Sequence, residues 1–488
     1  MTSQVNVADV RTELYIGGRW HRTVETRPII NPATGEVIAA VCEGTSSHAA
    51  LALDAAASAQ RAWRALSPLQ RAAFLRRIAQ LVEERAEHLA AIVTLEQGKT
   101  LAEARGEVGA TAEFFRYYAE FARRIEGEVL PSDAADEHVL ILRVPYGVSV
   151  GILPWNYPSV VCARMAAPAL IAGNTVVLKP HELTPLSALA LADICHDAGL
   201  PPGVLNIVTG PGEVVGDALV RDPRTDLITM TGSVEVGRRI LSAAAETITP
   251  VSLELGGKAP FVIMPDADLD EGVAAAVSTR FMNCGQVCTC NERTFVHEDV
   301  YEQFLAKYVD AVQSLRVGDP FDEATDMGPK VSQVELEKVA AMVQRATDAG
   351  AKVQTGGHIL RGGDFGRGYW YAPTVLTDVT PGMEVTEAEI FGPVSPVMSF
   401  TDPAGLLDQL NTSRYGLSAY LFTNDLSYAM RLANELEFGE LYINRIGPEQ
   451  LQGFHTGFRD SGLGGDDGKH GLDGFLRKKT VYLNYARR

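Results

Sequence analysis

VSVGILPWNYPSVVCARMAAPALIAGNTVVLK, residues 148–179, predicts a strand, a helix and a second strand. The runs 148–153 and 174–179 are short and apolar, as buried strands are, and a helix follows the turn PWNYP between them. Two strands joined by a helix favour a right-handed crossover and a parallel pair. This stretch therefore predicts an α/β fold.

The same alternation continues toward the C-terminus. We expect further strands at 204–208 and 227–230, and helices at 185–198, 213–220 and 236–245. Strands that alternate with helices in this way form a parallel sheet covered by helices, as in dinucleotide-binding folds. The region 47–124 is helical in its periodicity, and 138–144 (HVLILRV) predicts a strand.

A second α/β series begins near residue 253 and indicates a second domain. Its expected strands are 260–263, 293–296, 374–376, 419–422 and 441–443, and its expected helices are 269–281 and 300–315. The tail 480–485 (TVYLNY) predicts a strand that stands alone at the end of the chain.

Composition is that of an ordinary globular protein. The 488 residues are 46% hydrophobic and 21% charged, with a net charge of −18, which argues against binding to nucleic acid or to an anionic membrane surface. The sequence contains no run of about 18 apolar residues, so we expect no membrane span. The first 20 residues show no apolar leader. The six cysteines do not have the spacing of a disulfide framework, so together with these features they predict a cytoplasmic protein.

Cys288, in GQVC, is the candidate nucleophile because it stands between a predicted helix and a predicted strand. A cysteine attacks as its thiolate, and the alternative is a buried core thiol. A zinc site with Cys284, Cys290 and His297 is a second alternative, but C-x3-C-x-C lacks a matching ligand pair, so we expect no metal. Cys284 and Cys290 are packing residues or oxidation partners of Cys288.

Glu254 and Asn156 are the candidate base and oxyanion donor. Glu254 ends a predicted strand beside apolar residues and a glycine turn, which can raise the pKa of a carboxyl toward neutrality. The alternatives are a cap on the next turn or an ion pair with Lys258. Asn156 lies in a turn stiffened by two prolines and can donate to an oxyanion together with the Cys288 backbone N–H. Its alternative is an ordinary Asx turn.

The dinucleotide site lacks the sequence G-x-G-x-x-G. In TGSVEVG instead, Gly232 and Ser233 would leave backbone N–H groups free for a pyrophosphate, and Gly237 would permit close packing. Lys179 could donate to ribose hydroxyls. Glu182 could accept from the ribose 2′-hydroxyl and repel a 2′-phosphate, which favours NAD over NADP. Surface solvation is the alternative for both residues.

The chain resembles the aldehyde dehydrogenase superfamily from Asn31 to its tail, because six motifs occur in the order seen there: PWNYP, KPHE, TGSVEVG, ELGGK, GQVC and EIFGPV. The resemblance implies a Rossmann-like NAD domain, an α/β catalytic domain and a small β oligomerisation flap. The expected boundaries are 1–126 and 147–253 for the NAD domain, 254–446 for the catalytic domain, 127–146 and 470–488 for the flap, and 447–469 for a substrate-side loop returning toward the NAD domain.

The resemblance also implies residue roles. Cys288 would form a thiohemiacetal and then a thioester with an aldehyde, Asn156 would stabilise the oxyanion, and Glu254 would activate the hydrolytic water. The presence of Glu254 favours release of a free acid rather than acyl transfer to coenzyme A. The cofactor-side residues would be Leu153, Trp155, Lys179, Glu182, Gly232, Ser233, Glu389, Phe391 and Glu449.

Two stretches, NCGQVCTCNER and GELYINRIGPEQLQGFHTGFRDSGLGGDDGKHGL, are most similar to bacterial lactaldehyde and glycolaldehyde dehydrogenases. In that group the residues at Arg164 and His455 would hold a small 2-hydroxyaldehyde. A guanidinium in an apolar helix needs a partner, which for Arg164 is the substrate or a structural carboxylate. His455 could equally be a satisfied loop histidine, and Thr289 departs from the asparagine of the lactaldehyde enzymes.

Several alternatives stay open at this point. The same chemistry could serve a semialdehyde, betaine aldehyde or an aliphatic aldehyde. A non-catalytic binding protein of the same fold would not need Cys288, Glu254 and Asn156 together, and a thiol hydrolase would not need a dinucleotide site. The flap implies a homo-oligomer, with a tetramer favoured over a dimer, because strand pairing between subunits would cover exposed edges.

Overall fold

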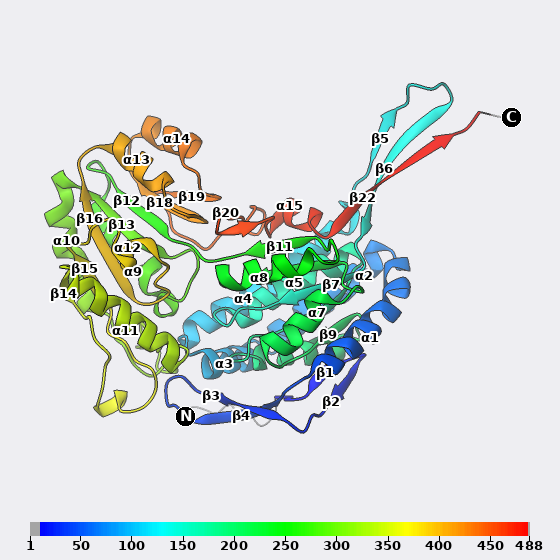
Figure 1. The fold of residues 1–488 in the computed structure, drawn as a ribbon, viewed down its shortest axis with the longest axis horizontal. Coiled ribbons are helices and arrows are strands. Elements are labelled where there is room, and N and C mark those ends of the chain that lie inside the picture. The colour runs from blue at the N-terminus through cyan, green and yellow to red at the C-terminus, as the bar shows by residue number, and fades with distance from the viewer. Residues whose placement is uncertain (1–9, 487–488) are drawn as a thin grey trace.

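The computed structural model describes residues 10–486 as two α/β lobes and a projecting arm (Figure 1). The first lobe holds an eight-stranded sheet in the order β2-β1-β9-β8-β7-β10-β11-β21. Its strands are β1 (Leu14–Ile16), β2 (Arg19–His21), β7 (Val148–Ile152), β8 (Thr175–Lys179), β9 (Leu205–Ile207), β10 (Leu227–Thr231), β11 (Val251–Glu254) and β21 (Gly462–Leu463).

The middle of this sheet is parallel, as the alternating pattern predicted. Strands β9, β8, β7, β10 and β11 run in the same direction, and the order reverses between β7 and β10. In a doubly wound sheet, ligands bind at the carboxyl ends of the strands where the order reverses. The turn PWNYP follows β7 and therefore lies at that point.

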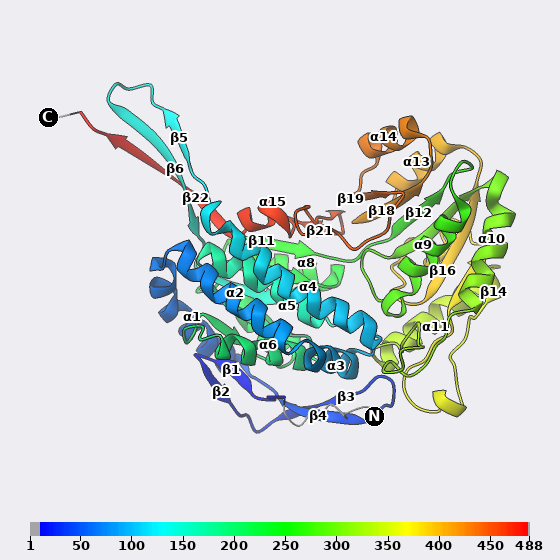
Figure 2. The same ribbon diagram turned by 180° about the vertical axis from the view of Figure 1, so that it is seen from behind.

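Helices cover both faces of the first sheet (Figure 2). On one face lie α1 (Ser46–Ala65), α7 (Asp217–Arg221) and α8 (Val234–Ala244); on the other lie α5 (Pro158–Ala172) and α6 (Leu186–Asp197), with α2 (Pro68–Glu84), α3 (Ala86–Gln97) and α4 (Leu101–Ala119) outside them. Capping boxes at Ser67 and Thr100 start α2 and α4. The expected helix 213–220 begins instead with a wide turn at Gly212–Gly216 before α7.

The second lobe holds a seven-stranded sheet in the order β14-β15-β16-β13-β12-β18-β19, parallel except for the edge strand β14. The strands are β12 (Ala259–Ile263), β13 (Asn291–His297), β14 (Lys352–Thr355), β15 (Thr374–Thr377), β16 (Val394–Phe400), β18 (Ser418–Phe422) and β19 (Glu440–Ile443). Its helices are α9 (Leu269–Phe281), α10 (Glu298–Gln313), α11 (Gln333–Asp348), α12 (Glu384–Glu387), α13 (Pro403–Asn411) and α14 (Leu426–Glu435).

The arm is a three-stranded antiparallel sheet of β5 (Glu128–Pro131), β6 (Glu137–Pro145) and β22 (Leu476–Asn484). The expectation that the tail strand stands alone is wrong, because β22 pairs with β6 along its whole length, from Leu476↔Pro145 to Asn484↔Glu137. Backbone pairing satisfies groups that a solitary strand would leave open. The arm's part in assembly stays a prediction.

The segment after β19 crosses from the second lobe back to the first (Figure 1). There β21 pairs with β11, placing Gly462 opposite Glu254, and α15 (Gly468–Asp473) packs against α5. Short elements that the sequence patterns did not reveal include β3 (Thr26–Ile30), β4 (Val37–Cys42), β17 (Tyr415–Gly416) and β20 (Phe458–Arg459).

The division into domains stays a prediction. Among residues 10–486, no helix is long and apolar enough to span a membrane.

Candidate active site

The predicted site residues of the first lobe gather at the carboxyl edge of its parallel strands. Asn156 follows β7, Lys179 ends β8, Ser233 follows β10 and Glu254 ends β11. Residues far apart in the chain thus share one edge because parallel strands all end on the same side. The second lobe contributes the turn that carries Cys288.

Two glycines let the two lobes approach closely at this edge. A Cβ on Gly257 would lie 2.4 Å from the Cys288 carbonyl oxygen, and one on Gly256 would lie 2.5 Å from Oε2 of Glu389. Neither separation is sterically allowed. Gly257 therefore sets the spacing between the base-bearing strand and the nucleophile turn, and Gly256 sets the approach of Glu389.

Cys288 lies in an irregular turn between α9 and β13. Asn283 and Cys284 have left-handed backbones with φ of 49° and 56°, and Cys288 is half-buried while Cys284 and Cys290 are buried. Burial raises the pKa of each of the two flanking thiols to about 12. Those two therefore behave as packing residues, and Cys288 is the accessible thiol of the turn.

Glu254 is a buried carboxyl, 4% exposed, and neither of its oxygens has a hydrogen-bond partner among residues 10–486. Burial raises its pKa well above the ordinary value. Both structural alternatives are wrong: Glu254 caps no turn, and Lys258 pairs with Glu292 at 2.8 Å instead. An unpartnered buried carboxyl is poised to take a proton.

His455 connects Glu254 with the nucleophile. Its Nε2 lies 3.6 Å from Oε2 of Glu254, its Nδ1 lies 3.1 Å from Oε1 of Glu440, and its ring contacts the Cys288 thiol. Burial alone would lower the pKa of His455, but Glu254, Cys288 and Glu440 together raise it well above its ordinary value. This histidine is therefore part of the site rather than a loop residue satisfied elsewhere.

Asn156 is held from both ends. Its Nδ2 donates to the carbonyl of Gln286 at 3.0 Å, two residues before the nucleophile, and its own carbonyl accepts from Lys99 Nζ at 2.9 Å. Lys99 is fully buried and forms an ion pair with Glu107, which also accepts from the backbone N–H of Ser159 at 2.8 Å. The sequence patterns did not reveal the role of this pair, because Lys99 and Glu107 stand close together in the chain while the groups they hold, at Asn156 and Ser159, lie more than 50 residues further on.

Of the residues expected on the cofactor side, Lys179 and Glu182 pair with each other at 2.9 Å. Lys179 is buried, so surface solvation is wrong for it. Burial alone would raise the pKa of Glu182, but the charges of Lys179 and His181 lower it on balance, which keeps this carboxylate charged.

The turn after β10 differs in part from expectation. The Gly232 N–H donates to the Glu254 carbonyl at 2.9 Å, so it is not free, because the pairing of β10 with β11 extends one residue further. Ser233 caps α8 by accepting from Val236 N–H. The expected close packing at Gly237 is confirmed, since a Cβ there would lie 2.7 Å from Leu255.

Glu389 and Phe391 face the same edge from the second lobe. Oε1 of Glu389 accepts from Gly257 N–H at 2.9 Å, and burial raises the pKa of Glu389 to about 7. The ring of Phe391 meets that of Trp155 edge-on at 5.2 Å between centroids. The buried Lys330 donates to the Phe391 carbonyl. Leu153, directly after β7, is buried.

Arg164 is bound by carboxylates. Its guanidinium donates to both oxygens of Asp467 at 3.0 and 2.9 Å, also contacts Glu449, and lies over the ring of Phe114 at 5.2 Å. Of the two partners that the sequence left open, the structure supplies the carboxylate. Glu449 consequently lies beside Arg164, and its place on the cofactor side stays a prediction.

A family model described as "Aldehyde dehydrogenase family" matches residues 20–481. The chain belongs to the aldehyde dehydrogenase family. A 3,6-anhydro-alpha-L-galactose dehydrogenase of Streptomyces coelicolor is 49% identical over 94% of each chain. Lactaldehyde dehydrogenase of Escherichia coli is 45% identical over 93% of this chain and 94% of that one.

Solved structures confirm the aldehyde dehydrogenase fold. A 3,6-anhydro-L-galactose dehydrogenase in complex with NADP has a TM-score of 0.95, with 45% identity over 97% of this chain and 99% of that chain. A betaine aldehyde dehydrogenase of Staphylococcus aureus in complex with NAD+ has a TM-score of 0.97, with 34% identity over 99% of this chain and 97% of that chain. This aldehyde dehydrogenase therefore catalyses an NAD(P)-dependent oxidation of an aldehyde.

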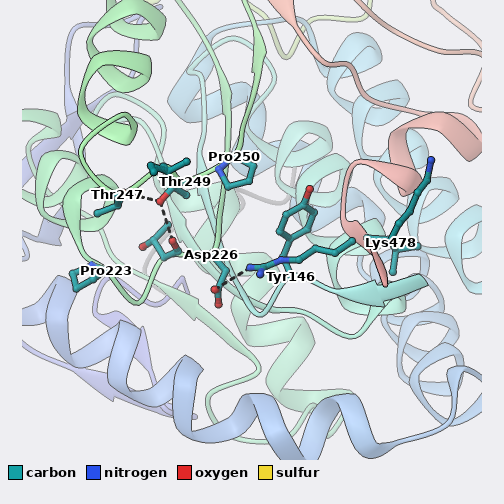
Figure 3. Close-up of a pocket in the computed structure, with 11 residues that line it drawn as sticks. Tyr146, Pro223, Asp226, Thr247, Thr249, Pro250 and Lys478 are labelled. Atoms are coloured by element: carbon teal, nitrogen blue, oxygen red, sulfur yellow. Dashed lines mark hydrogen bonds and ion pairs between the residues drawn. The ribbon is translucent and has the colours of Figure 1, made fainter. Parts of the chain in front are cut away.

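A large cavity of this aldehyde dehydrogenase lies outside the site. It measures about 810 Å³ and lies at the base of β22, where Asp226 pairs with Arg477 at 3.1 Å (Figure 3). None of the predicted site residues lines it. Among residues 10–486, no group of three or more His, Cys, Asp or Glu side chains is arranged to hold a metal ion.

Proposed function

We propose that this aldehyde dehydrogenase oxidises small 2-hydroxyaldehydes, such as lactaldehyde and glycolaldehyde, to free carboxylates with NAD. The observation that carries the proposal is the position of His455, which contacts both Glu254 and the Cys288 thiol. A nucleophile, an unpartnered base and a polar imidazole in one buried space are what oxidation and hydrolysis of such a substrate require.

In the first half of the reaction the Cys288 sulfur attacks the aldehyde carbon and forms a thiohemiacetal. Asn156 Nδ2, already aimed at the turn that carries Cys288, donates to the oxygen that becomes negative. The nicotinamide cofactor, when bound, accepts the hydride. Lys179, Glu182, Ser233 and Glu389 would hold it, since they lie at the edge where doubly wound sheets bind dinucleotides.

In the second half a water molecule hydrolyses the thioester on Cys288. Glu254 takes one proton from that water, and the hydroxide oxygen bonds to the acyl carbon as the C–S bond breaks. A raised pKa makes Glu254 a stronger proton acceptor than an ordinary carboxylate. The free acid then leaves the site.

We propose that the His455 imidazole binds the 2-hydroxyl of the substrate. Lactaldehyde and 3,6-anhydro-L-galactose, named by relatives of this chain, share a hydroxyl on the carbon beside the aldehyde. His455, in contact with the sulfur that binds the aldehyde carbon, would donate to or accept from that hydroxyl. Arg164 would hold Glu449 and Asp467 in place at the same end.

The charge of Glu182 supports NAD over NADP, because a carboxylate at the ribose repels a 2′-phosphate. We further propose that the predicted domains act as NAD-binding and catalytic units. The arm of β5, β6 and β22 would pair with a second subunit to give a cytoplasmic homotetramer, since it presents exposed strand edges and apolar side chains such as Val129 and Tyr482.

Initial rates on lactaldehyde, glycolaldehyde, 3,6-anhydro-L-galactose, succinic semialdehyde and betaine aldehyde, each with NAD and NADP, test the proposal. We expect the highest kcat/KM on a 2-hydroxyaldehyde with NAD, and no turnover by Cys288→Ser. A clear preference for a semialdehyde or for betaine aldehyde would overturn the substrate class. A preference for NADP would overturn the cofactor assignment alone.

A further inference from the structure

Hydrolysis delivers a proton to Glu254 in each turnover, and the surroundings of Glu254 offer it little contact with bulk water. Its side chain is 4% exposed, and both oxygens lie without a hydrogen-bond partner within residues 10–486. The proton must nevertheless leave before the next turnover. A path through neighbouring side chains would solve this problem.

Such a path begins at His455, whose side chain is 3% exposed, and continues to Glu440, whose side chain is 12% exposed. The joining distances are 3.6 Å from Glu254 Oε2 to His455 Nε2 and 3.1 Å from His455 Nδ1 to Glu440 Oε1. The second oxygen of Glu440 accepts from the Tyr442 hydroxyl at 3.0 Å, which fixes the carboxylate toward the ring.

We infer that Glu440 receives, through His455, the proton that Glu254 takes from the hydrolytic water. This inference rests on the proposed hydrolytic role of Glu254. The O–H bond on Glu254 breaks as Nε2–H forms on the ring; Nδ1–H breaks as O–H forms on Glu440, which then releases the proton to solvent. The first gap exceeds a direct hydrogen bond, and a small rotation of the Glu254 carboxylate closes it.

Electrostatics gives the path a direction. The pKa of His455 is raised because, against the effect of burial, the Glu254 anion favours its charged form. When the neutral ring, which carries its proton on Nδ1, takes the Glu254 proton at Nε2, the restored Glu254 anion stabilises the imidazolium, and the imidazolium then passes its Nδ1 proton to Glu440. The charged or titratable groups that face His455 are Glu254, Cys288, Glu440, Glu449, Asp466 and Asp467, with Arg164 behind them.

Two variants of Glu440 distinguish a proton relay from a structural role. Glu440→Gln keeps the shape and the acceptor for Nδ1–H but cannot take up the proton. Glu440→Asp is a poorer match in shape but keeps the carboxylate. A relay therefore ranks Asp above Gln, whereas a purely structural role ranks Gln above Asp.

The test uses p-nitrophenyl acetate, which acylates a reactive thiol without any cofactor. The burst of nitrophenolate measures acylation of Cys288, and the steady phase measures its hydrolysis. For Glu440→Gln we expect a burst within about twofold of wild type and a steady phase slowed about tenfold or more, with acetyl-enzyme accumulating by intact mass. Glu440→Asp should recover much of that loss.

Glu437→Gln is the matched control, because Glu437 is 61% exposed, pairs with Arg459 and lies three residues before Glu440. It should behave as wild type. An unchanged steady phase in Glu440→Gln, or loss of burst and steady phase together, or a slower Asp than Gln variant, would each overturn the relay. Because the ester needs neither the aldehyde nor NAD, a wrong substrate class would leave this result standing.

Discussion

Replacing Gly257 by alanine tests whether this glycine, three residues after Glu254, sets the position of the nucleophile. The new Cβ would lie 2.4 Å from the backbone carbonyl oxygen of Cys288, and such contacts essentially never fall below 3.0 Å. The Cys288 turn must therefore move by about 0.6 Å or more. Gly257 does not have a left-handed backbone, so alanine adds no conformational strain of its own.

The size of the effect follows from that displacement. A reacting group misplaced by about 1 Å costs on the order of 10²-fold in rate, so a shift of about 0.6 Å should slow acylation of Cys288 by about tenfold or more. Overpacking costs about 1–3 kcal/mol, and alanine returns about 0.4–1 kcal/mol by restricting the unfolded chain. The variant should remain folded while losing activity.

Rapid mixing with p-nitrophenyl acetate measures acylation, and a thermal melt measures stability. Gly256→Ala is the first control: its Cβ would meet the flexible end of Glu389 at 2.5 Å, so it should raise KM for NAD and spare ester acylation. Gly106→Ala in α4 meets nothing within 4 Å and should stabilise by about 0.5–1 kcal/mol without kinetic effect. Wild-type acylation by Gly257→Ala would refute the reasoning.

Three further predictions concern buried charges. Burial lowers the pKa of Lys330 from 10.5 to about 8, so between these pH values the unfolded chain holds the extra proton. The free energy of unfolding of wild type should therefore rise with pH relative to that of Lys330→Met, by up to about 3 kcal/mol. Denaturant midpoints at several pH values measure this difference. Lys99→Met leaves Glu107 buried and unpaired, and should lower the free energy of unfolding by about 3–5 kcal/mol in the same assay; an unchanged midpoint would contradict this. Glu182→Gln removes the charge that disfavours a 2′-phosphate, and should raise the ratio of kcat/KM for NADP to that for NAD by about tenfold; an unchanged ratio would show that Glu182 does not face the ribose.

The sequence by itself determined the local elements and the chemical types at the site. Parallel strands buried on both faces must be short apolar runs, so 148–153 and 174–179 were recognisable without any tertiary information. The motifs around Cys288, Glu254 and Asn156 likewise named a nucleophile, a base and an oxyanion donor. These features depend on residues within a few positions of one another, which is the range over which backbone periodicity and turn chemistry act.

Only the tertiary structure decided which side chains meet. Lys258 stands four residues after Glu254, yet it pairs with Glu292 in β13 of the second lobe. Glu254 instead faces His455, which is delivered by a segment that returns from the second lobe. An ion pair forms where packing brings charges together out of water, and that depends on how two sheets and their crossing segment assemble rather than on spacing along the chain.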